Sequence, residues 1–245
     1  MNYQYRYGTT LPVAMKTLYK EGGVLRFYRG YLPAIIQGPM SRFGDTASNA
    51  GMLALLDATD TTRNLPVVVK TGAASVAAGG FRILLMPVDT VKTMLQVEGA
   101  KGTAVLRTKF AAHGPKVFFQ GALGAAGATM VGHYPWFATY NTLQANIRPA
   151  GKDEPVYKLA RNALIGFCSS VVSDVTSNSI RVVKTTKQTY ATQISYVDTV
   201  KLIVAQDGVQ GLFLRGLGTR VLANGMQGMM FSVLWKYLED ALFKK

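Results

Sequence analysis

The sequence predicts an all-α membrane protein, a bundle of five transmembrane helices joined by short amphipathic helices, and three observations carry this prediction. Hydrophobic residues make up 49% of the 245 residues and charged residues only 16%, whereas about a quarter of a soluble domain is charged. Five stretches are long and weakly polar. Between them, short amphipathic stretches followed by glycine-containing turns recur, which indicates an internal repeat.

Each of the five long stretches could cross about 30 Å of hydrocarbon as a helix. They cover residues 35–56, 67–95, 122–143, 159–183 and 217–238. Their few charged residues would have to face the interior of the bundle or a water-filled cavity. Glycine and alanine are concentrated in the second and third stretches, where small side chains let membrane helices approach closely. A soluble pair of Gly/Ala-rich helices is the alternative explanation.

Charge and composition narrow the possible partners. The net charge is +14, which favours an acidic partner surface. The basic residues are spread along the chain beside apolar runs and no nucleic-acid-reading motif is present, so we expect anionic lipid or an anionic solute and no nucleic acid. Cys168 is the single cysteine, and His113 and His133 are far apart, so we expect no disulfide, no metal site and no cofactor. No nucleophile–base–acid set is visible, so we do not expect an enzyme.

Three turns carry one sequence pattern. Residues 21–30 (EGGVLRFYRG) match residues 207–216 (DGVQGLFLRG) at both ends, and residues 113–121 (HGPKVFFQG) form a weaker copy that is one residue shorter. Residues 87–92 (PVDTVK) precede the second turn, and residues 179–184 (SIRVVK) precede the third at a similar distance. Short amphipathic stretches at residues 11–19, 103–112 and 195–205 lead into the turns.

This compound pattern resembles the signature of the mitochondrial carrier family. The resemblance covers nearly the whole chain and implies three repeats of two membrane helices joined by a short matrix helix, arranged around a central solute path. It implies a multi-pass protein of the mitochondrial inner membrane without a cleaved presequence. The repeats would be residues 1–60, which are incomplete, 61–150 and 151–245. Counting back from Arg29 by the distance between Lys184 and Arg215 places the first signature lysine before Met1, so the first odd-numbered helix is expected to lie outside these 245 residues.

The resemblance also implies where a gate would lie on the matrix side. Asp89 and Lys92, three residues apart on one helix, would pair with residues of neighbouring repeats, and Lys184 is the corresponding base of the third repeat. Pro87 would kink its helix so that its end turns toward the axis. Ser179 and Arg181 replace the proline and the acid in the third repeat, so this gate is expected to be incomplete. The opposite gate has Asn141 and Gln144 in place of charged residues.

Positions counted from the turn glycines predict a solute cavity. Its basic members would suit a carboxylate or a phosphate. The predicted cavity residues are Gln37, Arg42, Arg82, Thr129, His133, Asn224 and Gln227. In the alternative, these polar groups form hydrogen bonds with one another between packed helices and bind no solute, and Arg42 simply pairs with Asp45.

The turns also predict lipid sites. Free amides at a helix start, together with a cation, can hold a lipid phosphate, and the resemblance suggests cardiolipin. The predicted lipid-binding residues are Arg29, Gly30, Gly121, Arg215 and Gly216. Gln120 replaces the basic residue of the middle copy, which weakens that site.

Two functions follow from these features. In the first hypothesis the protein is a carrier-derived accessory subunit, impaired in transport and held with other subunits in a large inner-membrane assembly such as a respiratory or ATP-synthase complex. In the second it is a divergent solute carrier that exchanges a small anionic metabolite, its first helix missing from the sequence through a misassigned start.

Overall fold

The computed structural model describes residues 1–149, 151, 154–227 and 230. These residues form helices and connecting turns, with no strand among them, which confirms the all-α prediction. In chain order the elements are α1 (Asn2–Tyr7), α2 (Leu11–Gly22), η1 (Val24–Tyr28), α3 (Tyr31–Asp57), α4 (Asp60–Arg63), α5 (Val67–Leu84), α6 (Met86–Glu98), η2 (Gly99–Lys101), α7 (Gly102–His113), η3 (Gly114–Phe119), α8 (Ala122–Asn146), α9 (Pro155–Thr189) and α10 (Tyr196–Leu214). A further helix follows over residues 217–227.

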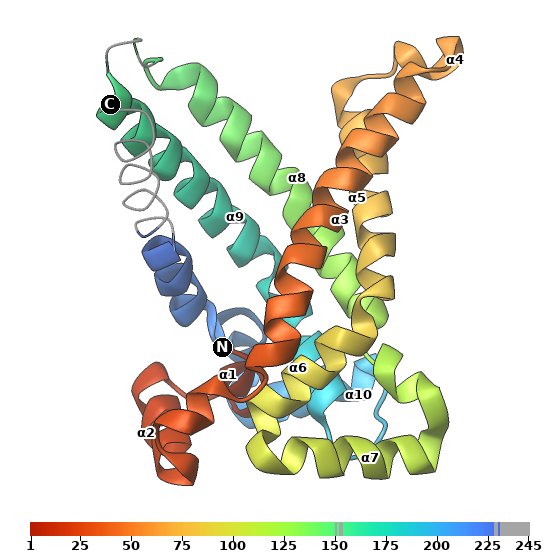
Figure 1. The fold of residues 1–245 in the computed structure, drawn as a ribbon, viewed down its shortest axis with the longest axis vertical. Coiled ribbons are helices and arrows are strands. Elements are labelled where there is room, and N and C mark those ends of the chain that lie inside the picture. The colour runs from red at the N-terminus through yellow and green to blue at the C-terminus, as the bar shows by residue number, and fades with distance from the viewer. Residues whose placement is uncertain (150, 152–153, 228–229, 231–245) are drawn as a thin grey trace, which may run out of the picture.

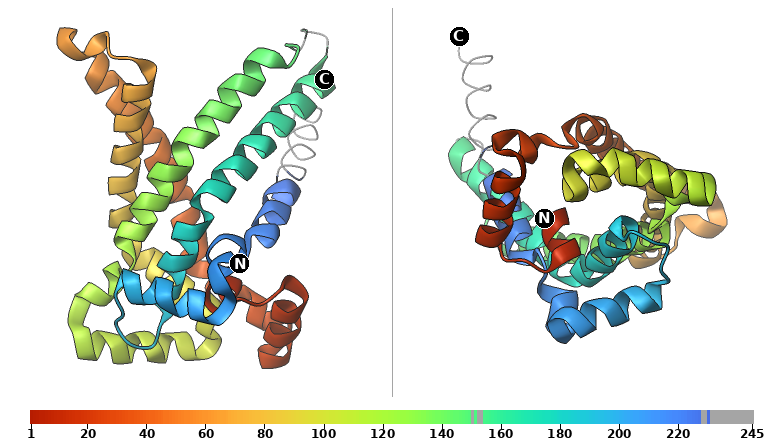
Figure 2. Two further views of the ribbon diagram at one scale, coloured as in Figure 1. Left: turned by 180° about the vertical axis from the view of Figure 1, so that it is seen from behind. Right: turned by 90° about the horizontal axis from the view of Figure 1, so that it is seen from below.

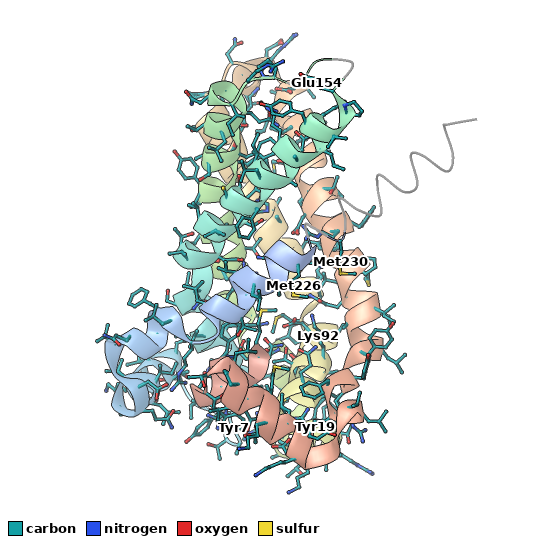
Figure 3. The ribbon with its side chains drawn as sticks, turned by 90° about the vertical axis from the view of Figure 1, so that its left-hand side faces the viewer. Tyr7, Tyr19, Lys92, Glu154, Met226 and Met230 are labelled. Carbon is teal, nitrogen blue, oxygen red and sulfur yellow. The ribbon has the colours of Figure 1, made fainter. Side chains whose placement is uncertain are left out.

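The long helices form one splayed wall around a central space. Helices α3, α5, α8 and α9 run along the long axis of the molecule and contact one another in chain order, whereas α2, α7 and α10 lie across one end (Figure 1). Lys92 lies between the level of Tyr7 and Tyr19 at that end and the level of Glu154 at the opposite end (Figure 3). The first, third and fourth predicted spans fall on α3, α8 and α9, and the second covers α5 and most of α6. The fifth begins on the helix of residues 217–227, and its last part, from residue 228, lies almost wholly outside the described residues.

The second predicted span is broken. Its helix stops at Leu84 and restarts at Met86, and Pro87 lies in the first turn of α6, where a missing backbone N–H does no harm. Among the described residues no single helix is both long and apolar enough to be assigned as a membrane span, and one pair, bent by 65° at this break, meets that criterion together. The number of five spans therefore stays a prediction.

Glycine packing explains how the long helices approach one another. A Cβ at Gly124 would lie 2.9 Å from Cβ of Lys184 on α9, and one at Gly132 would lie 2.9 Å from Oγ of Ser173. A Cβ at Gly79 would lie 3.1 Å from Cγ of Met130 on α8, whereas a Cβ at Gly72 would have no neighbouring atom within 4 Å. The small residues thus shape the contacts of α8 with α9 and α5, although not every glycine contributes.

The repeat is visible in the backbone. Gly30, Gly121 and Gly216 have φ of 80°, 86° and 65°, and each immediately precedes the next long helix. The short helices end or break at Gly23, Gly114 and Gly208, with φ of 60°, 65° and 67°. The alignment of the turn motifs pairs Gly22 with Gly208. This pairing is wrong by one residue, because Gly23 is the glycine with positive φ. The first and second turns therefore have equal length, and the third is one residue longer.

The N-terminal helix α1 is packed into the end of the bundle where the short helices lie. Tyr5 is 2% exposed, and its carbonyl accepts hydrogen bonds from Thr186 (3.1 Å) and Arg215 (3.3 Å). Asn2 donates a hydrogen bond to Gln96 on α6 at 2.6 Å. Seen from below, the N-terminus lies inside the ring of short helices (Figure 2).

Candidate functional site

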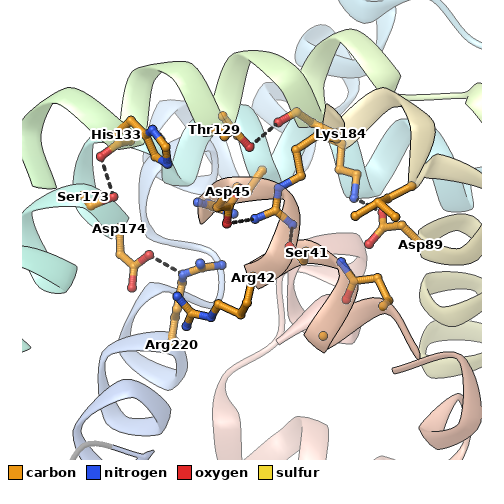
Figure 4. A pocket seen from close by; sticks show the side chains of 18 of the residues that line it. Ser41, Arg42, Asp45, Asp89, Thr129, His133, Ser173, Asp174, Lys184 and Arg220 are labelled. Atoms are coloured by element: carbon orange, nitrogen blue, oxygen red, sulfur yellow. Dashed lines mark hydrogen bonds and ion pairs between the residues drawn. The ribbon is translucent and has the colours of Figure 1, made fainter. Parts of the chain in front are cut away.

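A polar cavity of about 770 Å³ lies between the long helices. Side chains from α1, α3, α5, α6, α8, α9 and residues 217–227 line it (Figure 4). The structure brings all of the predicted cavity residues to this one cavity, together with the three residues predicted for the gate. They are Gln37, Arg42, Arg82, Thr129, His133, Asn224 and Gln227, and Asp89, Lys92 and Lys184.

At the wall formed by α3 and α5, Asp45 pairs with Arg82. The carboxylate accepts from Nη2 of Arg82 at 2.9 Å, and the same guanidinium also bonds Ser41. The alternative in which Asp45 pairs with Arg42 is therefore wrong. The physical reason is the close approach of the two helices at Gly44, where a Cβ would collide with the ring of Phe81, so Arg82 of α5 reaches Asp45 directly.

The opposite wall contains an ion pair that the sequence reasoning missed. Asp174 on α9 is 4% exposed and accepts from Nε of Arg220 at 2.5 Å and from the amide of Asn224. Both ionisable residues lie inside predicted membrane spans, and this alone is a signal of a functional or paired group. The signal was available in the sequence, but neither residue belongs to the repeated motif.

At the base of the cavity, α6 contacts both of its neighbours. Asp89 pairs with Lys184 of α9, and Gln188 donates to Thr90 at 2.8 Å beside it. Three residues along α6, Lys92 donates to the side-chain oxygen of Gln37 on α3 at 2.8 Å. The three predicted gate residues therefore lie at two junctions of the same helix.

The cavity lining carries more positive than negative charge. Its basic side chains are Arg42, Arg82, Lys92, Arg181, Lys184 and Arg220, and its acidic side chains are Asp45, Asp89 and Asp174. Each acid pairs with one base from another helix. Arg42, Lys92 and Arg181 are left without a carboxylate among the described residues; Nε of Arg181 bonds Ser177 at 3.0 Å instead. This excess gives the cavity a positive potential, which attracts anions.

The residues predicted to bind lipid differ in their surroundings. Gly30 and Gly121 precede the first turns of α3 and α8, and Arg29 is exposed. Arg215 is 5% exposed, and its Nε bonds Asp207 at 2.7 Å while Nη1 reaches the carbonyl of Tyr5. Its guanidinium therefore joins α10 to α1 within the protein.

An apolar pocket of about 470 Å³ lies close to one of these helix starts. It is lined mainly by aliphatic and aromatic side chains of α8, α9 and α10, including Leu123, Ile180 and Phe213. Tyr196 also lines it, and the backbone N–H of Gly124 donates to its hydroxyl at 3.1 Å. The start of α8 thus lies beside a groove that suits an acyl chain.

A family model described as "Mitochondrial carrier protein" matches residues 63–150 and 156–245. The chain is 31% identical over 146 residues to "Probable S-adenosylmethionine carrier 2, chloroplastic" of Arabidopsis thaliana, an alignment that covers 57% of this chain and 37% of that protein. It is 25% identical over 233 residues to "Mitochondrial thiamine pyrophosphate carrier 1" of Neurospora crassa (86% of this chain, 68% of that one). It is 26% identical over 231 residues to the protein of the same name from Sclerotinia sclerotiorum (86% and 69%).

Proposed function

This chain belongs to the mitochondrial carrier family, and on that premise we propose that it is a divergent solute carrier of the mitochondrial inner membrane that moves a small anion. The relatives named above are solute carriers, which fits this interpretation better than a transport-impaired accessory subunit. The proposal includes a multi-pass arrangement in the inner membrane, as in other members of the family.

One observation carries the proposal: the cavity is lined by six basic side chains against three acidic ones. Unpaired cations in a membrane-embedded cavity are costly unless a ligand or water compensates them, and such residues typically mark a substrate path. The same excess distinguishes between the solutes in the relatives' names. S-adenosylmethionine carries a sulfonium cation, whereas thiamine pyrophosphate carries a diphosphate, so we propose that the second kind of solute is the better match.

The base of the cavity is proposed to act as the gate on the matrix side. A solute that leaves through this end has to separate Asp89 from Lys184 and Lys92 from Gln37. Both contacts join elements of different repeats, so rocking of one repeat against another would break them, as alternating access requires. An anion bound to Lys92 and Lys184 would compete with Asp89 and so favour opening.

Membrane lipids, with cardiolipin among them, are proposed as partners at the starts of α3 and α8. The free amides after Gly30 and Gly121 can hold a phosphate, and the apolar groove beside Gly124 can take an acyl chain. Arg29 supplies a cation at the first of these starts. Because Arg215 is engaged with Asp207, the equivalent start after Gly216 is proposed to depend on backbone amides alone.

The test is exchange in proteoliposomes. The native protein is purified in mild detergent and reconstituted into liposomes that contain cardiolipin. The proteoliposomes are loaded with thiamine pyrophosphate or phosphate, and uptake of the same labelled solute is followed. Uptake of an anion above that of empty liposomes, reduced in an Arg42→Gln variant, is the expected result. Lys158→Gln is the matched control, since Lys158 is exposed on α9 and does not line the cavity.

A failure of exchange has its own interpretation. If no anion is taken up and the native protein migrates only within a very large particle, the accessory-subunit hypothesis replaces the carrier. Particle size in mild detergent and an intact mass of the native chain therefore accompany the uptake experiment.

A further inference from the structure

Three buried cations hold helix ends at the end of the bundle where α2, α7 and α10 lie (Figure 1). Arg26 of η1, Lys109 of α7 and Arg215, which follows α10, are 5%, 4% and 5% exposed. Each donates to backbone carbonyls in the last turn of another helix, where carbonyls lack partners within the helix. The accepting carbonyls are those of Gln96 and Val97 on α6 for Arg26, at 3.1 and 2.8 Å, of Gln188 on α9 for Lys109, at 3.2 Å, and of Tyr5 and Arg6 on α1 for Arg215, at 3.3 and 3.4 Å.

Every one of these contacts joins two different segments of the family pattern. Arg26 precedes the first segment matched by the family model, which contains α6. Lys109 lies in that first segment, and α9 lies in the second. Arg215 lies in the second segment, and α1 precedes both. The three contacts are called the ring latches, because they connect neighbouring segments in a cycle.

The latch formed by Lys109 differs from the other two in its charge. Nε of Arg26 bonds Glu21 at 2.8 Å, and Nε of Arg215 bonds Asp207 at 2.7 Å. Lys109 bonds no carboxylate within the part of the chain that the structure describes. A guanidinium keeps its proton in proteins, whereas a buried lysine can lose it. Lys109 is therefore the cation of the ring latches that can titrate.

The surroundings of Lys109 disfavour its charge. Burial lowers the pKa of Lys109 to about 8, Arg6 of α1 adds to the shift, and Glu98 at the end of α6 opposes it. On the α9 side Lys109 meets a neutral carbonyl, and the neighbouring Lys187 bonds the carbonyl of Ile194 instead. Among the other titratable side chains on α6, α7, η2 and η3, Asp89 and Lys92 are bonded at the base of the cavity, and Lys101, Arg107, His113 and Lys116 are exposed.

The helix end that Lys109 holds lies beside the predicted gate. The side chain of Gln188 donates to Thr90 at 2.8 Å, next to the pair of Asp89 and Lys184. Gln188 is thus held at its backbone by α7 and at its side chain by α6. Release of the backbone contact would leave the side-chain contact alone, and the end of α9 would be held more loosely against α6.

The direction of the pH effect follows from linkage. A lysine released to solvent has a pKa near 10.4, above that of buried Lys109. The released form therefore binds the proton more strongly, and protonation favours release. The same values give a roughly tenfold rise in the ratio of closed to released latch from pH 7 to pH 9.

We propose that Lys109 is a proton-sensitive latch between the second and third repeats, which releases the end of α9 beside Asp89 and Lys184 when Lys109 is protonated and holds it when Lys109 is neutral. A more alkaline pH at this end of the molecule thus tightens the base of the cavity. The inference does not depend on the proposed carrier function, because the latch acts in the protein without solute. Failure of solute exchange and failure of the latch are therefore separate results.

The experiment measures local opening at two helix ends of the same protein. Hydrogen–deuterium exchange of the full chain in mild detergent is followed by mass spectrometry at pH 7 and pH 9. Dividing the chemical exchange rate at each pH by the observed rate gives protection factors. We expect protection of residues 186–189, at the end of α9, to rise roughly tenfold from pH 7 to pH 9. Residues 95–98, at the end of α6, are held by Arg26 and serve as the internal control, whose protection should stay unchanged.

Variants assign the effect to Lys109. Lys109→Arg keeps a cation at every pH used, so protection of residues 186–189 at pH 9 should stay near its value at pH 7. Lys109→Met cannot titrate and should also lose the pH response. Lys116→Met removes an exposed cation of η3 and is the matched control, which should keep the tenfold rise. Melting temperatures check that each variant is folded.

Two results overturn the inference. In one, protection at the end of α9 changes with pH no more than protection at the end of α6, a comparison that needs no variant. In the other, Lys109→Arg shows the same rise as the unchanged protein, so that the titrating group lies elsewhere.

Discussion

The two junctions at the base of the cavity use neighbouring residues of α6 in unequal ways. On the α9 side, Asp89 and Lys184 form an ion pair whose side chains are only 16% and 13% exposed, and Gln188 adds a hydrogen bond to Thr90. On the α3 side, Lys92 meets the neutral amide oxygen of Gln37. The first junction joins two charges, whereas the second, in the part of the chain that the structure describes, leaves a cation with a single neutral acceptor.

This difference indicates which side of the base yields first. Separating a buried ion pair leaves two charges without partners in surroundings that solvate ions poorly. Separating Lys92 from Gln37 leaves only one charge and one neutral amide without partners. We therefore expect α3 to move away from α6 more readily than α9 does. Lys92 would then be the first cation of the base to meet a solute.

The largest expected effect comes from breaking the α9 junction on one side only. Lys184→Met leaves Asp89 buried without its cation, and the free energy of unfolding should fall by about 3–5 kcal/mol. The double variant Asp89→Asn/Lys184→Met removes both charges and should recover most of that loss. Thermal unfolding in mild detergent measures both, with exposed Lys158→Met as the control. Equal melting temperatures for the single and double variants would contradict a strong pair.

A smaller effect should follow from making the two junctions alike. Gln37→Glu places a carboxylate where Lys92 now donates to an amide, and we expect a gain of roughly 1 kcal/mol, because desolvation offsets much of the attraction. Exchange in proteoliposomes should become slower, since both sides of the base are then held by ion pairs. Gln37→Leu is the counterpart and should lower the melting temperature. If Gln37→Glu exchanges solute faster than the unchanged protein, the α3 junction is not part of the gate.

Much of the fold followed from local signals in the sequence. Hydropathy and the turn glycines gave the positions of the long and short helices, and the family assignment from the repeats is confirmed by the family match. Asp89 and Lys184 could be named because the repeated motif marks both. That they meet across two helices follows from the arrangement of repeats, which the resemblance supplied.

Other contacts could not be predicted from the chain. Asp174 and Arg220 lie 46 residues apart on different helices, and nothing local relates them. The sequence offered Arg42, three residues away on the same helix, as a partner of Asp45, and only the close approach at Gly44 brings Arg82 to it instead. In the first turn the sequence pattern aligns Gly22 with Gly208, whereas the backbone conformation selects the adjacent Gly23. These outcomes depend on tertiary packing, which single-sequence patterns do not contain.

The smallest expected effect concerns Lys109, whose hydrogen bond to Gln188 holds the end of α9 next to the junction with α6. Lys109 on α7 is 4% exposed and donates to the carbonyl of Gln188 at 3.2 Å. Burial, with a smaller contribution from nearby Arg6, lowers the pKa of Lys109 to about 8, and Glu98 opposes this shift. In the unfolded chain the pKa is near 10.4, so between about pH 8 and pH 10 the unfolded state binds more protons than the folded state. Stability from this residue therefore rises with pH through that window and is lowest below it.

Lys109→Met should remove this pH dependence. At pH 7 the variant should differ from the unchanged protein by less than about 1 kcal/mol, because the lost hydrogen bond to Gln188 offsets the relief of burying a cation. Between pH 8 and pH 10 the melting temperature of the unchanged protein should rise relative to that of the variant. Lys116→Met, in the turn that follows α7, is a control for the loss of one positive charge. If the melting temperatures of the two proteins instead change in parallel between pH 8 and pH 10, Lys109 keeps its proton in the folded state. The charged ammonium group of Lys109 then stabilises the end of α9 through its contact with Gln188.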